Sequence, residues 1–211
     1  MVSTQDIVAQ AKALFAELDA LPDDARMDAV NEIRLALHEH SPMRSEPVDC
    51  VIWVRQDAVH ANDYNPNSVA PPEMRLLQLS IQADGYTQPI VAMSEEDGRY
   101  EIVDGFHRNR VGREVGAVRK RVKGRLPIAV INAGRTSRED RMAATIRHNR
   151  ARGKHSVDTM ADIVVDLHRR GWDQEKIGKE LGMDADEVLR LRQTTGLAAA
   201  FADREFSKAW E

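Results

Sequence analysis

The sequence predicts an α+β protein in which a mixed-sheet domain lies between two helical segments. Short apolar runs bounded by turn residues, such as those at 51–54 and 127–131, predict strands in the middle of the chain. Apolar residues spaced three or four positions apart predict amphipathic helices at both ends. We therefore expect an N-terminal helical hairpin at residues 1–45, a sheet domain at 46–135 and a helical domain at 136–211.

The first 45 residues predict two helices that carry no recognisable chemistry. Ile7 and Leu14 recur at helical spacing, and Ser3 or Thr4 is suited to cap the first helix. The residues LPDD at 21–24 end this helix and begin a second one, with apolar positions at Met27, Val30, Ile33, Leu35 and Leu37. An amphipathic hairpin packs either on the main domain or on a second copy of the chain, so a homodimer is one expected state.

From residue 50 the apolar period changes to that of strands. CVIWV followed by VHAND predicts one strand that ends in a turn-rich loop, and Pro71-Pro72 begins a helix. The apolar face predicted for that helix consists of Met74, Leu77, Leu79 and Ile81. The remaining elements predicted for the sheet domain are strands at 88–93, 99–103 and 127–131 and a helix at 106–115.

The last third of the chain predicts helices only. Helices at 136–153 and 156–170 precede a segment with helix-turn-helix form, in which Gly182 makes the turn. The apolar positions expected to close this unit are Ile177, Leu181, Val188 and Leu191.

Composition excludes several classes of protein. No apolar run approaches the roughly 20 residues that span a bilayer, and the N-terminus lacks the basic and apolar regions of a secretory signal. The single cysteine, Cys50, excludes an internal disulfide and is expected to be a small apolar residue beside the first strand. We therefore expect a cytoplasmic protein without a membrane partner.

The basic residues concentrate in one block. Residues 104–154 hold 15 lysine and arginine residues against 4 acidic residues, a charge of +11 within a chain whose net charge is −4. Such a block indicates a polyanionic partner: a nucleotide, a nucleic acid or free phosphate. The structural alternative is a solvated face, or a patch neutralised by the acidic N-terminal segment.

The basic block begins at a predicted strand-to-helix turn, VDGFHRNR at 103–110. The first N–H groups of a helix are unpaired, and the helix dipole favours an anion there. Gly105 lets the backbone approach an anion, Arg108 can bind it through two N–H groups, and His107 can donate a hydrogen bond or pass a proton. Asp104 could hold a metal ion or orient a hydroxyl, or it could cap the helix.

Taken together, residues 50–152 resemble the ParB/sulfiredoxin superfamily. The motifs follow the family's order: the N-P loop ANDYNPN, a helix ending in Asp-Gly, the strand YTQPIVA, the turn VDGFHRNRVGREVG and the later segment TIRHNRARG. The resemblance continues through the helix-turn-helix, as in ParB-type proteins, and covers about two-thirds of the chain.

The resemblance implies that CTP, ATP or ADP binds at the turn together with Mg²⁺. Asn149 and Arg150 fall where partition proteins use an Asn/Gln-Arg segment near the triphosphate and its metal, so Asn149 is the candidate metal ligand. The candidate nucleotide site as a whole is Gln88, Asp104, Gly105, Phe106, His107, Arg108, Asn149 and Arg150.

Two departures from the family narrow the implied chemistry. Sulfiredoxins place a nucleophilic cysteine where this chain has Phe106, which argues against sulfinic-acid reduction. Segregation-type ParB proteins carry Gly-Glu-Arg-Arg and Glu-Asn-x-x-Arg, whereas this chain has GFHR and IRHNR. The Asp-Gly-x-His-Arg form is closer to ParB-like free serine kinases and to IbrB-like regulators.

A serine kinase-like phosphotransferase requires a group that deprotonates the serine hydroxyl. Asp63, in the loop NDYNPN, is the local candidate, and His107 is the second candidate for proton transfer. The alternative role of Asp63 is to close an Asx-turn in its own loop.

DNA has two candidate surfaces. The second helix of the helix-turn-helix carries basic residues, but Asp184, Asp186 and Glu187 crowd the end from which bases are normally read. The basic block supplies another surface at 150–154, suited to phosphate contact. The candidate DNA-binding residues are Arg150, Arg152, Lys154, Arg190, Arg192 and Gln193.

The leading hypothesis is a ParB-like nucleotide-binding protein that binds DNA or regulates DNA-linked processes. The alternative is an enzyme, either an NTPase or a serine kinase-like phosphotransferase. The third hypothesis is an interaction module with a vestigial pocket. The expected partners are a nucleotide and DNA.

Overall fold

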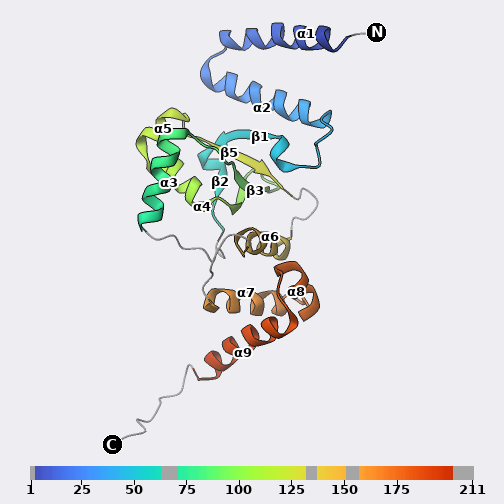
Figure 1. The fold of residues 1–211 in the computed structure, drawn as a ribbon, viewed down its shortest axis with the longest axis vertical. Helices are drawn as coiled ribbons and strands as arrows, with labels where there is room; N and C mark the ends of the chain where they lie inside the picture. The colour runs from blue at the N-terminus through green and yellow to red at the C-terminus, as the bar shows by residue number, and fades with distance from the viewer. Residues whose placement is uncertain (1–2, 63–70, 132–136, 151–156, 202–211) are drawn as a thin grey trace, which may run out of the picture.

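The computed structural model describes residues 3–62, 71–131, 137–150 and 157–201 (Figure 1). Its centre is a mixed five-stranded sheet with the order β1-β5-β3-β4-β2, in which β1–β5 and β3–β4 are antiparallel and β5–β3 and β4–β2 are parallel. The predicted α+β class is therefore confirmed. The strands are β1 (Val51–Arg55), β2 (Val59–His60), β3 (Ile90–Ser94), β4 (Tyr100–Asp104) and β5 (Arg125–Val130).

Alternating side chains of the strands build apolar clusters on the two faces of the sheet. Ile102 belongs to one cluster and its neighbour Val103 to the other, as the period of two in a strand requires. Helix α6 (Arg138–Arg150) covers the Val103 face through Ala144. Beside the sheet, α3 (Pro71–Asp84), α4 (Phe106–Glu114) and α5 (Gly116–Arg121) pack around a cluster of Ile81, Val111 and Val118.

The apolar segment at 51–60, predicted as one strand, forms two. β1 and β2 lie at opposite edges of the sheet, and the 3₁₀ turn η3 (Gln56–Ala58) separates them. The guanidinium of Arg113 donates to the carbonyls of Gln56 and Val59 and so holds both ends of this turn. The prediction of a single strand was wrong, because the polar residues Arg55, Gln56 and Asp57 interrupt the apolar run and the chain turns there.

The N-terminal segment forms α1 (Thr4–Ala16), η1 (Glu17–Ala20) and α2 (Asp23–Glu39), followed after a short connection by η2 (Pro47–Asp49). Ser3 caps α1 in a capping box with Asp6. α2 docks on the edge strand β1, because the Asn31 amide bonds both the N–H and the C=O of Trp53, at 2.9 and 2.8 Å. Arg125, buried in β5, adds ion pairs to Asp24 and Asp28 of α2.

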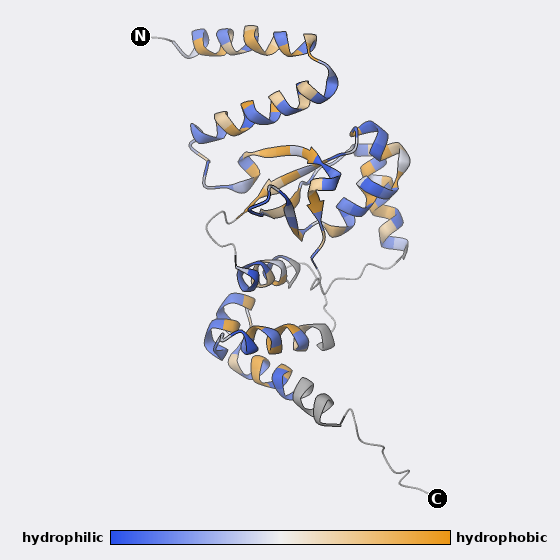
Figure 2. Ribbon diagram, turned by 180° about the vertical axis from the view of Figure 1, so that it is seen from behind, coloured by the Kyte–Doolittle hydropathy of each residue, from blue (hydrophilic) through white to orange (hydrophobic). Residues whose placement is uncertain are grey.

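Several predicted apolar faces are exposed. α1 buries none of its side chains, with Ile7 58% and Leu14 64% exposed, and Figure 2 shows apolar positions along this helix. In the other helices, the predicted apolar positions Leu35, Leu37 and Leu79 are exposed.

The C-terminal helices form a unit with its own core. α6 and α7 (Val157–Arg169) precede α8 (Gln174–Leu181) and α9 (Ala185–Phe201), and Ile177, Leu181 and Val188 lie in one buried cluster. Asp173 caps α8, and Gly182 adopts φ +67 in the turn to α9. None of the helices in the described ranges is long and apolar enough to cross a membrane.

Candidate phosphate and nucleic-acid sites

The turn between β4 and α4 has the geometry of an anion-binding helix start. Gly105 is the N-cap of α4 and adopts φ +92, a left-handed conformation that favours glycine. The N–H of Asn109 donates to the carbonyl of Gly105 at 2.9 Å, which is the first bond of the helix. The preceding amide groups of α4 therefore have no partner within the helix and face its N-terminal end.

Arg108 folds back over this turn. Its guanidinium donates to Gln88 Oε1 at 3.1 Å and to Asp104 Oδ2 at 3.0 Å, and the Asp104 side chain is only 9% exposed. The Nε of Arg108 is buried without a partner among the described residues. The structure thus brings Gln88, Asp104, Gly105 and Arg108 together and leaves one donor of the arginine unused.

Tyr86 stabilises the first turn of α4. Its hydroxyl donates to the carbonyl of Arg108 at 2.9 Å, and its ring packs where Gly112 has no side chain. Burial raises the pKa of Tyr86 to about 12, so the hydroxyl remains a donor over the whole physiological range. Tyr86 was not predicted as a site residue from the sequence. A glycine inside a helix, here Gly112, is the sequence signal of such a close contact.

His107 is the least satisfied polar side chain of the turn. Both ring nitrogens are buried, and neither has a hydrogen-bond partner among the described residues. The ring lies edge-to-face with Phe106, with centroids 5.6 Å apart. Burial, followed by the charges of Arg110 and Arg108, lowers the pKa of His107 below its ordinary value of 6.5. At neutral pH the ring is therefore uncharged and offers one donor and one acceptor.

The lowered pKa of His107 makes stability depend on pH. Folded protein binds a proton at His107 less readily than the unfolded chain does. The stability that His107 contributes is therefore fully present above pH 6.5, and it is lost as the pH falls through the lowered pKa of the folded state. We expect the free energy of unfolding of His107→Gln to fall less than that of the wild type between neutral and mildly acidic pH. Urea unfolding at a series of pH values measures the free energy of unfolding, with His40→Gln, at an exposed position, as the control. The same pH dependence of this free energy in the wild type and in His107→Gln would contradict the prediction.

Several predicted site residues lie outside the described part of the chain. These are Asp63, Arg152 and Lys154, together with the side chains of Asn149 and Arg150, whose backbones end α6. Within the described ranges, no three His, Cys, Asp or Glu side chains come together as a metal site.

Asn62, at the start of the N-P loop, has two structural partners that the sequence did not reveal. Its amide donates to the carbonyl of Ile102 at 2.7 Å and to the buried hydroxyl of Thr145 at 3.2 Å. The start of the loop is therefore tied to both β4 and α6, beside the strand that ends at the turn.

A cavity lies on the Phe106 side of the turn. Its volume is about 470 Å³, within the usual range for small-molecule sites. His60 on its wall pairs with Glu95, at 2.8 Å between Nε2 and Oε2. The cavity is lined by Val59, His60, Ala61, Phe106, Asn109, Arg110, Arg113 and Glu114.

The helix-turn-helix unit presents part of the predicted DNA surface. Arg190 donates to the carbonyl of Asp186, Arg192 lies 2.9 Å from Nε2 of His168, and Gln193 is exposed. Asp184 accepts from the N–H of Glu187 at 2.7 Å and caps α9. One of the three acids at the start of this helix is thus explained by capping.

Two family models match this chain. The model of the ParB N-terminal domain matches residues 41–146, which is half of the chain. The chain belongs to the ParB N-terminal domain family. This ParB-like chain also matches the model of the IbrB-like C-terminal HTH domain, at residues 155–203. The resemblance stated from the sequence motifs is therefore confirmed, as is the helix-turn-helix form of the C-terminal unit.

Individual relatives of the ParB-like chain cover most of its length. The uncharacterized protein YbdM of Escherichia coli (strain K12) is 55% identical over 193 residues, which are 92% of this chain and 91% of that protein. The solved structure of C-terminally truncated chromosome-partitioning protein ParB from Caulobacter crescentus, complexed to the centromeric parS site, is 19% identical with a TM-score of 0.47. The match covers 71% of the ParB-like chain and 75% of the chain in that structure. The structure of that truncated protein complexed with CTP-gamma-S has a TM-score of 0.38 and is 20% identical. This match covers 72% of the ParB-like chain and 86% of the chain in that structure.

Proposed function

We propose that this ParB-like chain binds a nucleotide at the Gly105–Arg108 turn and acts on DNA as a nucleotide-dependent regulator. The observation that carries the proposal is a set of three buried nitrogens at the turn that have no partner among the described residues: both ring nitrogens of His107 and Nε of Arg108. Buried polar atoms of native proteins are normally hydrogen-bonded. Phosphate oxygens at a helix N-terminus would accept from Arg108 and from His107.

Calorimetry tests the nucleotide hypothesis. CTP, ATP, ADP and inorganic phosphate are titrated separately, each nucleotide with and without Mg²⁺. We expect saturable binding of at least one nucleotide, strengthened by Mg²⁺. The proposal is overturned if neither a nucleotide nor phosphate binds.

DNA is proposed to bind the helical unit through Arg190, Arg192 and Gln193, with Arg150, Arg152 and Lys154 as additional phosphate contacts. Each lysine or arginine that neutralises a phosphate adds about one to the slope of log affinity against log salt. We expect Arg190→Gln/Arg192→Gln to weaken duplex binding and to reduce the slope by about two. Fluorescence anisotropy over a salt series measures both. Arg44→Gln/Arg55→Gln, outside the helical unit, is the charge-matched control, and an equal loss in both double variants would contradict the assignment.

The competing hypothesis is a phosphotransferase of the serine kinase type, supported by the cavity beside Phe106, which leaves room for a small second substrate. In this reaction the serine hydroxyl oxygen attacks the terminal phosphorus, the bond to the leaving nucleotide breaks, and the hydroxyl proton passes to a base such as Asp63 or His107. Nucleotide turnover that requires added free serine would favour this enzyme over the regulator. If the protein binds no nucleotide, either with or without DNA, the third hypothesis, an interaction module with a vestigial pocket, is the one that remains.

A homodimer through α1 is part of the proposal. A helix of about 13 residues is marginal in water without packing, and Ile7 and Leu14 of α1 are exposed. Asp6, Glu17 and Asp19 outnumber Lys12 in this segment, which disfavours an anionic membrane or DNA as the occupant. We expect light scattering to give a dimer for the wild type and a monomer for Leu14→Asp. Ala9→Asp, on the opposite side of the helix, is expected to remain dimeric; a monomeric wild type would contradict this.

A further inference from the structure

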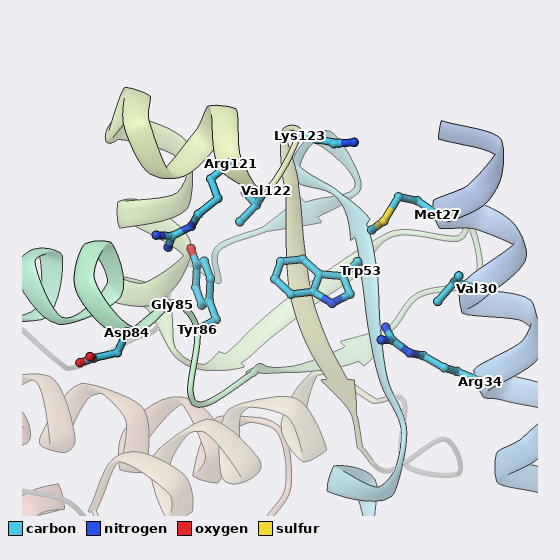
Figure 3. Close-up of a pocket in the computed structure, with 10 residues that line it drawn as sticks. All are labelled: Met27, Val30, Arg34, Trp53, Asp84, Gly85, Tyr86, Arg121, Val122 and Lys123. Atoms are coloured by element: carbon cyan, nitrogen blue, oxygen red, sulfur yellow. The ribbon is translucent and has the colours of Figure 1, made fainter. Parts of the chain in front are cut away.

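A cavity of about 440 Å³ lies between α2 and the sheet (Figure 3), and Tyr86, which bonds the carbonyl of Arg108, is part of its wall. Met27, Val30 and Arg34 of α2 form one wall, and Trp53 of β1 and Tyr86 form the facing wall. The end of α5 completes it through Arg121, Val122 and Lys123.

Fixed contacts hold these walls apart. The two hydrogen bonds between Asn31 and the backbone of Trp53 set the distance from α2 to β1. Trp53 and Tyr86 pack edge-to-face, with centroids 6.0 Å apart and an interplanar angle of 88°. Arg121 donates to the carbonyl of Gln82 at 2.8 Å and ties the end of α3 to α5. The cavity is therefore preformed rather than a gap that a side chain could close.

The charges around the cavity favour an anion. Arg34, Arg121 and Lys123 line it, against the single acid Asp84. Lys123 is paired with Asp23 and Arg34 donates to the carbonyl of Val51 at 3.2 Å, so each cation is anchored while donors of the arginine remain available. Among the described residues, the indole N–H of Trp53 has no hydrogen-bond partner.

We propose that this cavity binds a small carboxylic acid with an aromatic or branched aliphatic body. The body would pack between Trp53 and the apolar residues Met27, Val30 and Val122, and the carboxylate would accept from Arg34. The volume is at the small end of the range for ligand sites, about 300–1,000 Å³. The mainly apolar walls favour such an acid over a nucleotide, whose phosphates require more donors. The inference stands whether or not the turn binds a nucleotide.

The test uses the full chain labelled with ¹⁵N and follows the indole N–H signals of its three tryptophans. Trp53→Phe identifies the signal of Trp53. Phenylacetate and 4-methylpentanoate are the probes, and phenylacetamide is the neutral analogue of the first. We expect a saturable shift of the Trp53 signal with the acids, and about tenfold weaker binding of the amide, because the charge-assisted hydrogen bond is lost.

A variant of the proposed anion partner separates this site from non-specific binding. Arg34→Gln is expected to bind phenylacetate about tenfold more weakly, whereas Arg44→Gln, which does not line this cavity, should bind as the wild type does. Unchanged spectra and melting temperatures without ligand would show that both variants are folded. The inference is overturned if the Trp53 signal does not respond to millimolar acid, if the amide binds equally well, or if Arg34→Gln has no effect.

Discussion

Arg108→Ala is expected to weaken nucleotide binding about 10- to 100-fold, because charge-assisted hydrogen bonds of a guanidinium to phosphate are worth about 1.5–3 kcal/mol. Arg108 is the one basic side chain of the turn that folds over Gly105. Its Nε is buried without a partner among the described residues and would donate to the ligand. Calorimetry with CTP, ATP and ADP in the presence of Mg²⁺ measures the loss.

Two further variants make this result specific. Arg110 lies on the same helix but is bound to Glu114 at the surface, so Arg110→Ala should retain most of the affinity. Arg108→Lys keeps the charge but loses the planar fork, and we expect an intermediate affinity. Removing the arginine also leaves the nearly buried Asp104 without its guanidinium, so thermal melts must accompany each titration. Equal affinity of Arg108→Ala and wild type would refute the phosphate assignment.

Gly112→Ala is expected to destabilise the sheet domain by about 1–3 kcal/mol, the range for overpacking of a core. A Cβ at this position would meet the Tyr86 hydroxyl oxygen and lie 2.5 Å from Cδ2 of Leu126. Displacement of Tyr86 would also release the carbonyl of Arg108, so nucleotide affinity should fall together with stability. Urea unfolding measures the first effect and calorimetry the second.

Gly116→Ala is the matched control for this substitution. Nothing lies within 4 Å of a Cβ at Gly116, and its backbone is not left-handed. Replacement of such a glycine in a helix stabilises by about 0.4–1 kcal/mol. If both alanine variants unfold alike, Tyr86 is not packed against Gly112 as the structure has it.

The positions of the helices and most strands could be predicted because they follow from local periodicity. The break at 56–58 was missed although the polar residues Arg55, Gln56 and Asp57 interrupt the apolar run there. The local pattern could not show that the two halves join opposite edges of the sheet, or that Arg113, more than 50 residues away, donates to both ends of the turn. Exposure of Leu37 and Leu79 could not be predicted either, because an apolar stripe has the same period whether or not another element covers it.

The turn itself could be predicted from Gly105 and the residues that follow it, since strand, glycine and helix are local features. The partners that orient Arg108 could not. Gln88 and Tyr86 lie 20 and 22 residues before it, and only the sheet order brings the start of β3 beside the end of β4. The interior glycine at 112 was the available signal, because such a residue costs about 1 kcal/mol relative to alanine.

The positions of β1 and β2 at opposite edges constrain the shape of the sheet. Four strand spacings of about 4.8 Å separate the edges by about 19 Å in a flat sheet, whereas the four residue steps from Arg55 to Val59 reach at most about 14 Å. The sheet must therefore curl until its first and last strands approach one another, as in a half-closed barrel. The Arg113 contacts at Gln56 and Val59 fasten this curl. Arg113 therefore helps to hold the first and last strands near one another, and its loss should loosen the curl.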